Sequence, residues 1–360
     1  MMNTIKKTGI VLFIGVLVSL KAFAGDPDRA GQAGATQLLI NPWAASSGQG
    51  NANMGSIAGV EAMSLNPAGI LGVRNNEFEV SHALWMGNLG VAINSFGLCQ
   101  RVGKDKDNAI GFAITSFDFG NIPLTSESQP ENTGQTYTIS MVNVALDFAH
   151  RFSDNITAGV IFRAINEGIP GVNASGASLD AGIQYVAGKS DRYHFGVALR
   201  NVGPAMQFTG AGLSDHGILD GSSYAVTLDK RSDEFELPSL LNIAGGYDII
   251  VPDSTTKNTL SVNLGYTSNS FSNDQFALGL EFSLSGYLKL RAGFVYESGI
   301  FNVATTSSAF AGPCGGVTVD IPFGKDRGDR AKAKRLALDY SYRAAAQFGG
   351  THTFGLRLNL

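Results

Sequence analysis

The residues best placed to do chemistry are charged side chains at the polar positions of stretches in which polar and apolar residues alternate. There are eleven of them, namely Asp147, Arg151, Arg163, Asp180, Arg200, Glu281, Lys289, Arg291, Arg335, Asp339 and Arg343. If these stretches are extended, the charges share one face, because successive side chains of a strand point to opposite faces. Such a face can pair opposite charges across neighbouring strands, as Glu281 could with Lys289 and Arg291, or it can line a polar path or a ligand site.

Other patterns typical of catalysis or metal binding are missing from the sequence. No His-Glu-x-x-His motif and no Gly-x-Ser-x-Gly turn occurs, and neither Cys99 nor Cys314 has a partner at metal-ligand spacing. The isolated histidines are His82, His150, His194, His216 and His352. We therefore expect no enzyme, no cofactor and no metal site. Whether the two cysteines form a disulfide in an exported protein is left open.

The elements that must position the charges are strands of about ten residues, the length of a transmembrane β-strand. In the stretch 141–152, apolar residues such as Leu146 and Phe148 alternate with Ala145, Asp147 and Ala149. The same polarity recurs in the stretches 275–284 and 335–343. A soluble sandwich would place few charges opposite its core, so the pattern predicts an all-β protein, a transmembrane antiparallel barrel with a polar lumen and an apolar outside.

The first 24 residues predict a secretory signal peptide. A basic start is followed by an apolar run from Ile10 to Leu20 and by Ala22-Phe23-Ala24, a small-x-small cleavage site, so the mature chain should begin near Gly25. No cysteine follows the site, which argues against a lipoprotein. No other stretch approaches the roughly 20 apolar residues that a membrane helix needs.

Composition excludes one class of partner. Without Lys6, Lys7 and Lys21 of the leader, the formal charge moves from −4 to −7. No basic surface for nucleic acid is expected from such a chain. Glycine is abundant, at 45 of 360 residues, as expected where strands need small lumen residues.

We predict that residues 77–360 form the barrel, with about fourteen strands. Their expected ranges are 77–85, 89–101, 108–119, 137–152, 155–166, 177–187, 193–202, 239–250, 259–268, 274–285, 287–297, 311–323, 334–344 and 351–360. An even number places both barrel termini on the same side of the membrane. Because its outside is apolar, we expect the barrel to lie in outer-membrane lipid.

The connections between these strands separate by parity. Those after even strands are mostly short and polar, such as 103–107 and 285–286, with 324–333 as the longer exception. The long connections follow odd strands, at 120–136, 167–176, 203–238 and 298–312. Outer-membrane barrels have short periplasmic turns and long outer loops, so we expect periplasmic barrel termini and extracellular long loops.

Residues 25–76 do not follow the strand pattern. Small residues and glycines predominate, Ser56–Leu65 is weakly helical, and Asn66-Pro67 should stop that helix. The segment is either a connector folded into the barrel mouth or a plug of the lumen. A phosphate-binding glycine loop is excluded, since no G-x-G-x-x-G or G-K-[ST] motif is present.

A family resemblance rests on this segment. Ala33-Gly34-Ala35 is followed by Leu38-Leu39-Ile40 and then by the run from Glu61 to Ile70, in which Glu61, Asn66, Pro67, Ala68 and Gly69 match a signature. This opening resembles that of the PorV/PorQ family of Bacteroidota outer-membrane proteins. The family is similar to FadL-type barrels, which carry a comparable D-A-x-x-x-x-N-P-A-G segment, with Glu61 here at the acidic position.

The last strand resembles the insertion signal of outer-membrane barrels. Thr353, Gly355, Leu358 and Leu360 follow a polar-x-Gly-x-x-apolar-x-apolar pattern, with Leu360 in place of the usual terminal aromatic residue.

Two functions follow from the resemblance. PorV-like proteins work with the type IX secretion system, so the resemblance implies an accessory role with a translocon barrel and the C-terminal domains of secreted cargo as partners. The alternative is a FadL-like channel for small hydrophobic molecules. The segment 203–238 is either a partner surface or a cap over the mouth. We favour the secretion role, because the mature chain is shorter than typical FadL-type transporters and the lumen face is charged.

Overall fold

The computed structural model describes residues 25–131, 133–218, 224–252, 258–302, 306, 308–310, 312–324, 333–345 and 348–360. The predicted signal peptide lies outside these residues, as do parts of the predicted connections 203–238, 298–312 and 324–333. No helix in the described ranges is long and apolar enough to cross a membrane.

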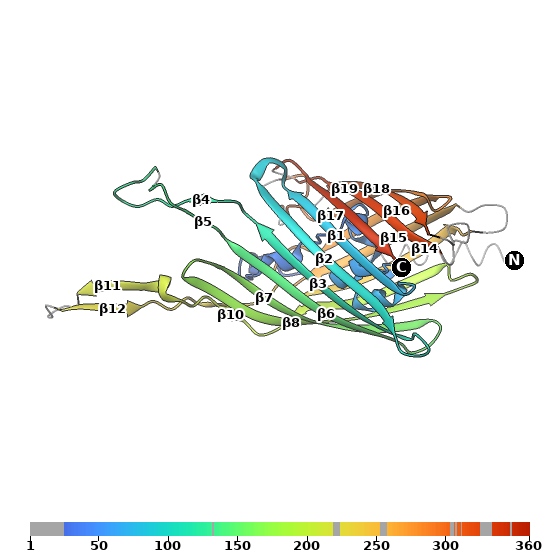
Figure 1. Cartoon of the computed structure of the whole chain (residues 1–360), viewed down its shortest axis with the longest axis horizontal. Coiled ribbons are helices and arrows are strands. Elements are labelled where there is room, and N and C mark those ends of the chain that lie inside the picture. Colours follow the sequence, from blue (N-terminus) through green and yellow to red (C-terminus); the bar gives the residue numbers. More distant parts are fainter. Residues whose placement is uncertain are drawn as a thin grey trace.

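Fourteen antiparallel strands form a closed barrel, as the sequence predicts (Figure 1). The strands are β1 (Asn76–Trp85), β2 (Val91–Val102), β3 (Asn108–Asp118), β6 (Ser140–Arg151), β7 (Ile156–Ile169), β8 (Val172–Ala187), β9 (Tyr193–Val202), β14 (Leu240–Ile250), β15 (Thr259–Asn269), β16 (Gln275–Leu284), β17 (Leu288–Glu297), β18 (Gly312–Phe323), β19 (Lys334–Arg343) and β20 (Thr351–Asn359). Each pairs with the next in this order, and β1 pairs with β20 to close the ring.

The alternation of side chains along each strand produces an apolar outside. On β6, Leu146 is 56% and Phe148 47% exposed, whereas Asp147 is only 4% exposed. Register brings outward residues together, since Leu146 lies opposite Phe112 of β3 and Phe162 of β7. Outward apolar residues recur on the other barrel strands, which is the surface that lipid requires.

The two ends of the barrel differ. One end, which we call the turn end, holds short connections such as 103–107 and both barrel termini, where the N–H of Leu360 donates to the carbonyl of Asn76. The opposite end, the excursion end, carries the long connections. Three small sheets form there, namely β4 (Ile122–Pro123) with β5 (Thr136–Tyr137), β10 (Met206–Gln207) with β13 (Glu234–Phe235), and β11 (Ser214–Ile218) with β12 (Ala225–Asp229). The β4–β5 and β11–β12 hairpins project well beyond the barrel (Figure 1).

The prediction of a long loop at 167–176 is wrong. Strands β7 and β8 stay paired until Ile169 lies opposite Val172, and a turn with Gly171 at φ +86° joins them. Glycine and small polar residues weaken the apolar alternation here. Inward residues of this region are nevertheless buried, such as Glu167 and Ala174. Glu167 accepts a hydrogen bond from the side chain of Gln37 in the lumen segment at 3.0 Å.

Residues 33–73, which we call the lumen segment, lie inside the barrel (Figure 1, blue). Short helical turns make it up: η2 (Thr36–Leu39), α2 (Ala44–Ser47), η3 (Ala52–Gly55), η4 (Val60–Ser64) and η5 (Pro67–Gly72). The predicted helix over Ser56–Leu65 is therefore only partly present. Asn66-Pro67 ends η4 as expected and also starts η5, since the Asn66 side chain accepts from the N–H of Ala68 and proline suits a first helical position.

The main core of the protein forms between this segment and small residues of the wall. Trp43, Met63, Ile70 and Leu71 of the segment are at most 2% exposed and pack with alanines such as Ala149. Ten strands add an inward glycine that contacts the segment; this glycine belt is Gly97, Gly111, Gly159, Gly182, Gly196, Gly265, Gly279, Gly293, Gly316 and Gly355. A side chain there would meet the segment, so the belt allows backbone to approach backbone.

Candidate functional site

All eleven predicted charges occupy inward positions of their strands, and most form ion pairs between neighbouring strands. The expected pairing of β16 with β17 is present: Arg291 Nε lies 2.7 Å and Lys289 Nζ 3.9 Å from the Glu281 carboxylate. Arg163 lies 2.8 Å from Asp180. Buried or half-buried pairs of this kind leave few free charges along much of the lumen wall.

Asp339 of β19 joins residues of three other strands, β17, β18 and β20, in one network. Its carboxylate lies 3.9 Å from Arg291 and 3.3 Å from Arg357, and it accepts a hydrogen bond from the Thr318 hydroxyl. The sequence reasoning missed Arg357, although it shares the inward phase of β20 with Thr353 and Gly355.

Two other predicted cations pair with carboxylates that were not predicted. Arg335 lies 2.9 Å from Asp320 on the neighbouring strand β18. Arg151 lies 3.7 Å from Asp107 in the turn between β2 and β3. Both contacts lie close to the turn end, where partial exposure of the groups reduces the energy of such pairs.

Polar side chains of the wall also satisfy the backbone of the lumen segment. Arg163 donates to the carbonyl of Met63 at 3.1 Å, and Gln184 donates to that of Ile57 at 2.9 Å. Short helical turns leave many carbonyl and N–H groups without partners, and buried groups of this kind need one. The wall thus holds the segment by hydrogen bonds as well as by packing. Asp147 has no such role, since neither carboxylate oxygen has a hydrogen-bond partner within the described ranges.

The signature residues hold the segment together and attach it to the wall. The Glu61 carboxylate accepts from the N–H groups of Ala45 at 2.8 Å and Ser46 at 2.7 Å, at the start of α2. Asn66 donates to the carbonyl of Ile183 in β8 at 3.1 Å. Pro67 and Ala68 pack against the wall, and Gly69 has no room for a side chain, since a Cβ would lie 2.4 Å from the Ile57 carbonyl oxygen. These contacts are structural.

The C-terminal pattern divides between the two faces of β20. Thr353 and Gly355 point inward and are buried, whereas Leu358 points outward. Leu360 follows the strand and pairs with Asn76 through two backbone hydrogen bonds. Both cysteines are free thiols, so no disulfide joins them.

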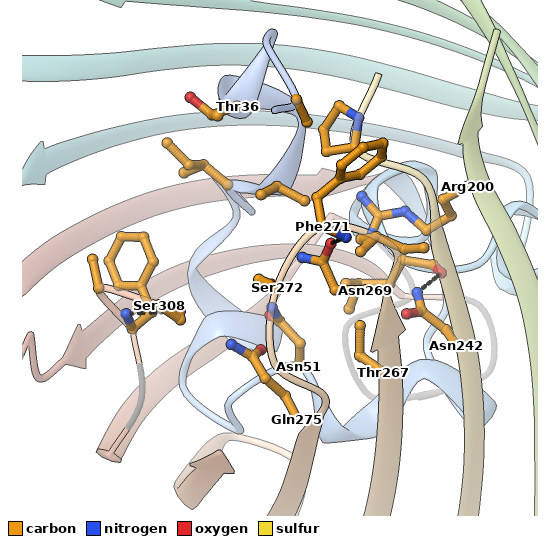
Figure 2. Close-up of a pocket in the computed structure, with 18 of the residues that line it drawn as sticks. Thr36, Asn51, Arg200, Asn242, Thr267, Asn269, Phe271, Ser272, Gln275 and Ser308 are labelled. Atoms are coloured by element: carbon orange, nitrogen blue, oxygen red, sulfur yellow. Dashed lines mark hydrogen bonds between the residues drawn. The ribbon is translucent and has the colours of Figure 1, made fainter. Parts of the chain in front are cut away.

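A cavity of about 450 Å³ lies at the excursion end, between the lumen segment and the wall (Figure 2). We call it the mouth cavity. Its floor includes Met54 and Leu65 of the segment, and Phe271 and Phe310 approach from the connections of the excursion end. The wall adds polar groups from three strands: Asn242 of β14, Thr267 and Asn269 of β15, and Gln275 of β16. Sequence patterns gave no sign of this cavity, because its lining comes from separate parts of the chain.

Two guanidinium groups face the mouth cavity, and no carboxylate belongs to its described lining. Arg200 is 7% exposed, donates to the carbonyl of Leu38 at 3.5 Å, and has an Nε without a hydrogen-bond partner. Figure 2 shows its side chain extending toward Phe271. Arg343 donates to the carbonyl of Phe310 at 3.2 Å and lies over its ring. Neither arginine forms an ion pair with a carboxylate of the described chain, although Asp180 outside the lining also acts electrostatically on Arg200, so two cationic groups face the cavity.

A β-bulge lies directly after Arg200, at the end of β9 beside this cavity. Leu179 of β8 lies opposite Val202 and Ala181 lies opposite Leu199, so two residues of β9 face one of β8. Within the bulge Asn201 has φ +59°, and its N–H donates to Asp180 at 2.7 Å. Arg200 points inward in the regular alternation of β9, and the bulge turns Asn201 inward as well. Bulges re-aim side chains in this way beside binding sites.

No group of three or more metal-ligating side chains is found in the described part of the chain. No family model matches the sequence, and no curated protein sequence matches it either.

Solved structures show what the fold resembles. The Pseudomonas putida toluene transporter TodX has a TM-score of 0.50 at 11% identity over 85% of this chain and 93% of that chain. A Pseudomonas aeruginosa FadL homologue gives 0.50 at 10% identity, over 88% and 96% of the two chains. The CymD monoaromatic hydrocarbon channel gives 0.50 at 10% identity, over 89% and 96%. In fold, the chain is similar to these barrels, and its own closed barrel has fourteen strands.

Proposed function

We propose that this protein is an outer-membrane barrel that takes hydrophobic small molecules into the mouth cavity, without catalysis. The observation that carries the proposal is the cavity itself, about 450 Å³ in volume, with the lumen segment as its floor. Concave, largely apolar sites of this size with a few convergent polar groups typically bind small molecules. The solved structures named for toluene and monoaromatic hydrocarbon transport support the proposal, because they share the fold. This reverses the preference drawn from sequence alone.

The charges of the cavity define the ligand further. Aromatic and aliphatic side chains would hold a hydrocarbon body, while Arg200 and Arg343 would bind an anionic or hydrogen-bond-accepting group. Arginine suits this role because its planar donors match oxygen acceptors.

Binding of a fluorescent hydrophobic probe tests the function. Purified protein in detergent should bind N-phenyl-1-naphthylamine, and Thr267→Trp, which fills the cavity from the inward face of β15, should weaken binding at least tenfold. Leu264→Trp on the outward face of the same strand is the control, since Leu264 is 47% exposed. Equal binding by both variants would show that the probe occupies another place.

The proposed topology places the turn end in the periplasm and the excursion end outside the cell, after removal of residues 1–24. In this topology residues 25–76 act as the plug of the barrel formed by residues 77–360. A membrane-impermeant maleimide added to whole cells should label Tyr224→Cys, whose parent side chain is 78% exposed, and should not label Lys189→Cys at the turn end. The reverse result would invert the topology.

An accessory role in type IX-like protein secretion is the second candidate. The projecting β4–β5 and β11–β12 hairpins favour it, because they carry exposed apolar residues such as Leu124 and Leu228 away from the membrane (Figure 1). Exposed apolar residues of this kind suit contacts with a translocon barrel or cargo domains. Affinity purification from membranes should recover such partners, and removal of the β11–β12 hairpin should abolish the recovery. Purification of the barrel alone under mild detergent would count against this role.

A further inference from the structure

The predicted start of the mature chain lies against a buried carboxylate. Gly25 packs on the connection between β15 and β16 at the excursion end, so closely that a Cβ on it would lie 2.6 Å from Asp274 Oδ1 and 2.6 Å from the carbonyl oxygen of Ser272. Asp274 is only 8% exposed, and its other carboxylate oxygen accepts a hydrogen bond from the Tyr266 hydroxyl at 2.8 Å.

Residues 25–34, which we call the strap, are attached to two connections of the excursion end. Arg29 lies 3.0 Å from Glu236 and 4.2 Å from the centre of the Phe271 ring. Farther along, the N–H of Gly34 donates to the carbonyl of Glu236 at 3.0 Å, and Ala33 forms a parallel bridge with the same residue. The strap crosses the mouth, and three of its residues line the mouth cavity: Ala30, Gly31 and Ala33.

We propose that removal of the leader creates a salt bridge between the new α-ammonium group of Gly25 and Asp274, and that this salt bridge fixes the strap as a wall of the mouth cavity. The step is hydrolysis of the Ala24–Gly25 peptide bond by a leader-cleaving peptidase, which consumes one water. Ala24 leaves as a carboxylate, and the freed amine of Gly25 takes up a proton, as α-amino groups do near neutral pH. A charge pair at a mostly buried site is stronger than one in open solvent.

Before cleavage, Gly25 carries a neutral amide in place of the ammonium group. The precursor therefore lacks the cation that Asp274 pairs with in the processed chain. The proposed salt bridge therefore forms only after processing, and it adds to the contacts of Arg29 and Gly34 with Glu236 that also hold the strap. The proposal concerns the chain's own terminus and does not depend on which ligand the cavity binds.

N-terminal labelling of the full, processed barrel tests the salt bridge. Mass spectrometry first establishes that the purified chain begins at Gly25. The folded protein is then treated with 2-pyridinecarboxaldehyde, which reacts with free α-amino groups, and the rate is followed by mass spectrometry. We expect Asp274→Asn to react at least tenfold faster than the wild type. Asp26→Asn, which removes an exposed carboxylate beside the terminus, should react at the wild-type rate.

A second variant covers the case in which Asp274→Asn does not fold. Insertion of Gly-Ser between Ala24 and Gly25 moves the ammonium group two residues away from Asp274 and should also raise the labelling rate at least tenfold. Wild-type labelling as fast as that of the insertion variant, or a mature chain that starts elsewhere, would overturn the proposal. The labelling experiment uses no ligand, so its result does not decide the proposed uptake function, which the probe-binding experiment tests separately.

Discussion

The barrel interior is built differently in its two parts, the lower part toward the turn end and the upper part toward the excursion end. Below, residues 41–73 meet glycines and alanines, and the wall provides partners for their backbone groups. In the upper part, the wall presents larger side chains, and Arg200 and Arg343 face a cavity whose described lining holds no carboxylate. Small inward residues therefore mark where the barrel holds its own chain. Large inward residues with unused hydrogen-bonding groups mark where it can hold something else.

The largest effect should come from filling the glycine belt. Gly159→Val would place a Cβ 2.6 Å from the backbone carbon and 2.7 Å from the oxygen of Pro67, atoms that cannot move without moving the lumen segment. We expect a loss of more than about 3 kcal/mol in stability, the upper range for overpacking. Urea unfolding followed by heat-modifiable gel mobility measures it. Gly245→Val is the control, because its Cβ would meet only the Phe195 ring at 3.9 Å. Equal stability of the two variants would show that the inward glycines are not needed for packing of the lumen segment.

A smaller loss should follow from Glu61→Gln in the lower part. The carboxylate accepts two backbone N–H groups at 2.8 and 2.7 Å, and the amide replaces one of its acceptor oxygens with a donor. One buried N–H group then loses its partner, which costs about 1–3 kcal/mol. The same unfolding assay applies. Glu127→Gln in the exposed excursion between β3 and β6 should leave the midpoint unchanged; a shift of similar size in both would indicate a general effect of charge.

In the upper part, substitution should change binding more than stability. Arg200→Gln should weaken binding of dansyl-undecanoate about tenfold, equivalent to about 1.4 kcal/mol, because the variant loses the positive charge. Binding of the neutral N-phenyl-1-naphthylamine should change less than about twofold. Fluorescence titration with both probes separates these outcomes. An equal loss for the two probes would mean that Arg200 shapes the cavity instead of selecting charge.

The smallest effect is expected outside the barrel interior. Lys230 lies 2.7 Å from Asp215 in the β11–β12 region, but the two side chains are 67% and 59% exposed. Exposed pairs contribute little, so Lys230→Ala should change stability by less than about 0.5 kcal/mol. Calorimetry of the barrel provides the measurement. A clear loss of stability would show that the projecting hairpins are coupled to the barrel.

Strand number and facing were predictable because they depend on a local period of two. The apolar Leu146 and the charged Asp147 are neighbours in the sequence, so their side chains are expected on opposite faces of a strand. A similar alternation occurs in the other barrel strands. The loop predicted at 167–176 was wrong because small residues carry no such period. The pairing of Glu281 with Arg291 was predictable for the same local reason.

The mouth cavity could not be predicted, because it depends on contacts between distant parts of the chain. The inward position of Arg200 follows from the period of two in β9, but no local pattern shows that Phe271 and Phe310 line the same cavity. The partners of Arg163 include the Met63 carbonyl, and no pattern in β7 specifies where that carbonyl lies. Likewise, Glu61 was recognised as a signature position, but its contact with α2 requires the folded segment.

The glycine belt also constrains the order of assembly. The lumen segment precedes β1 in the chain, and ten strands approach it so closely that its backbone occupies the space beside their inward glycines. A cylinder that closed while empty would leave no route for this folded insert to enter sideways afterwards. We therefore expect β1 and β20 to pair last, after the lumen segment has taken its place among the strands. The segment, which is exported before the strands, would then guide the closure of the barrel.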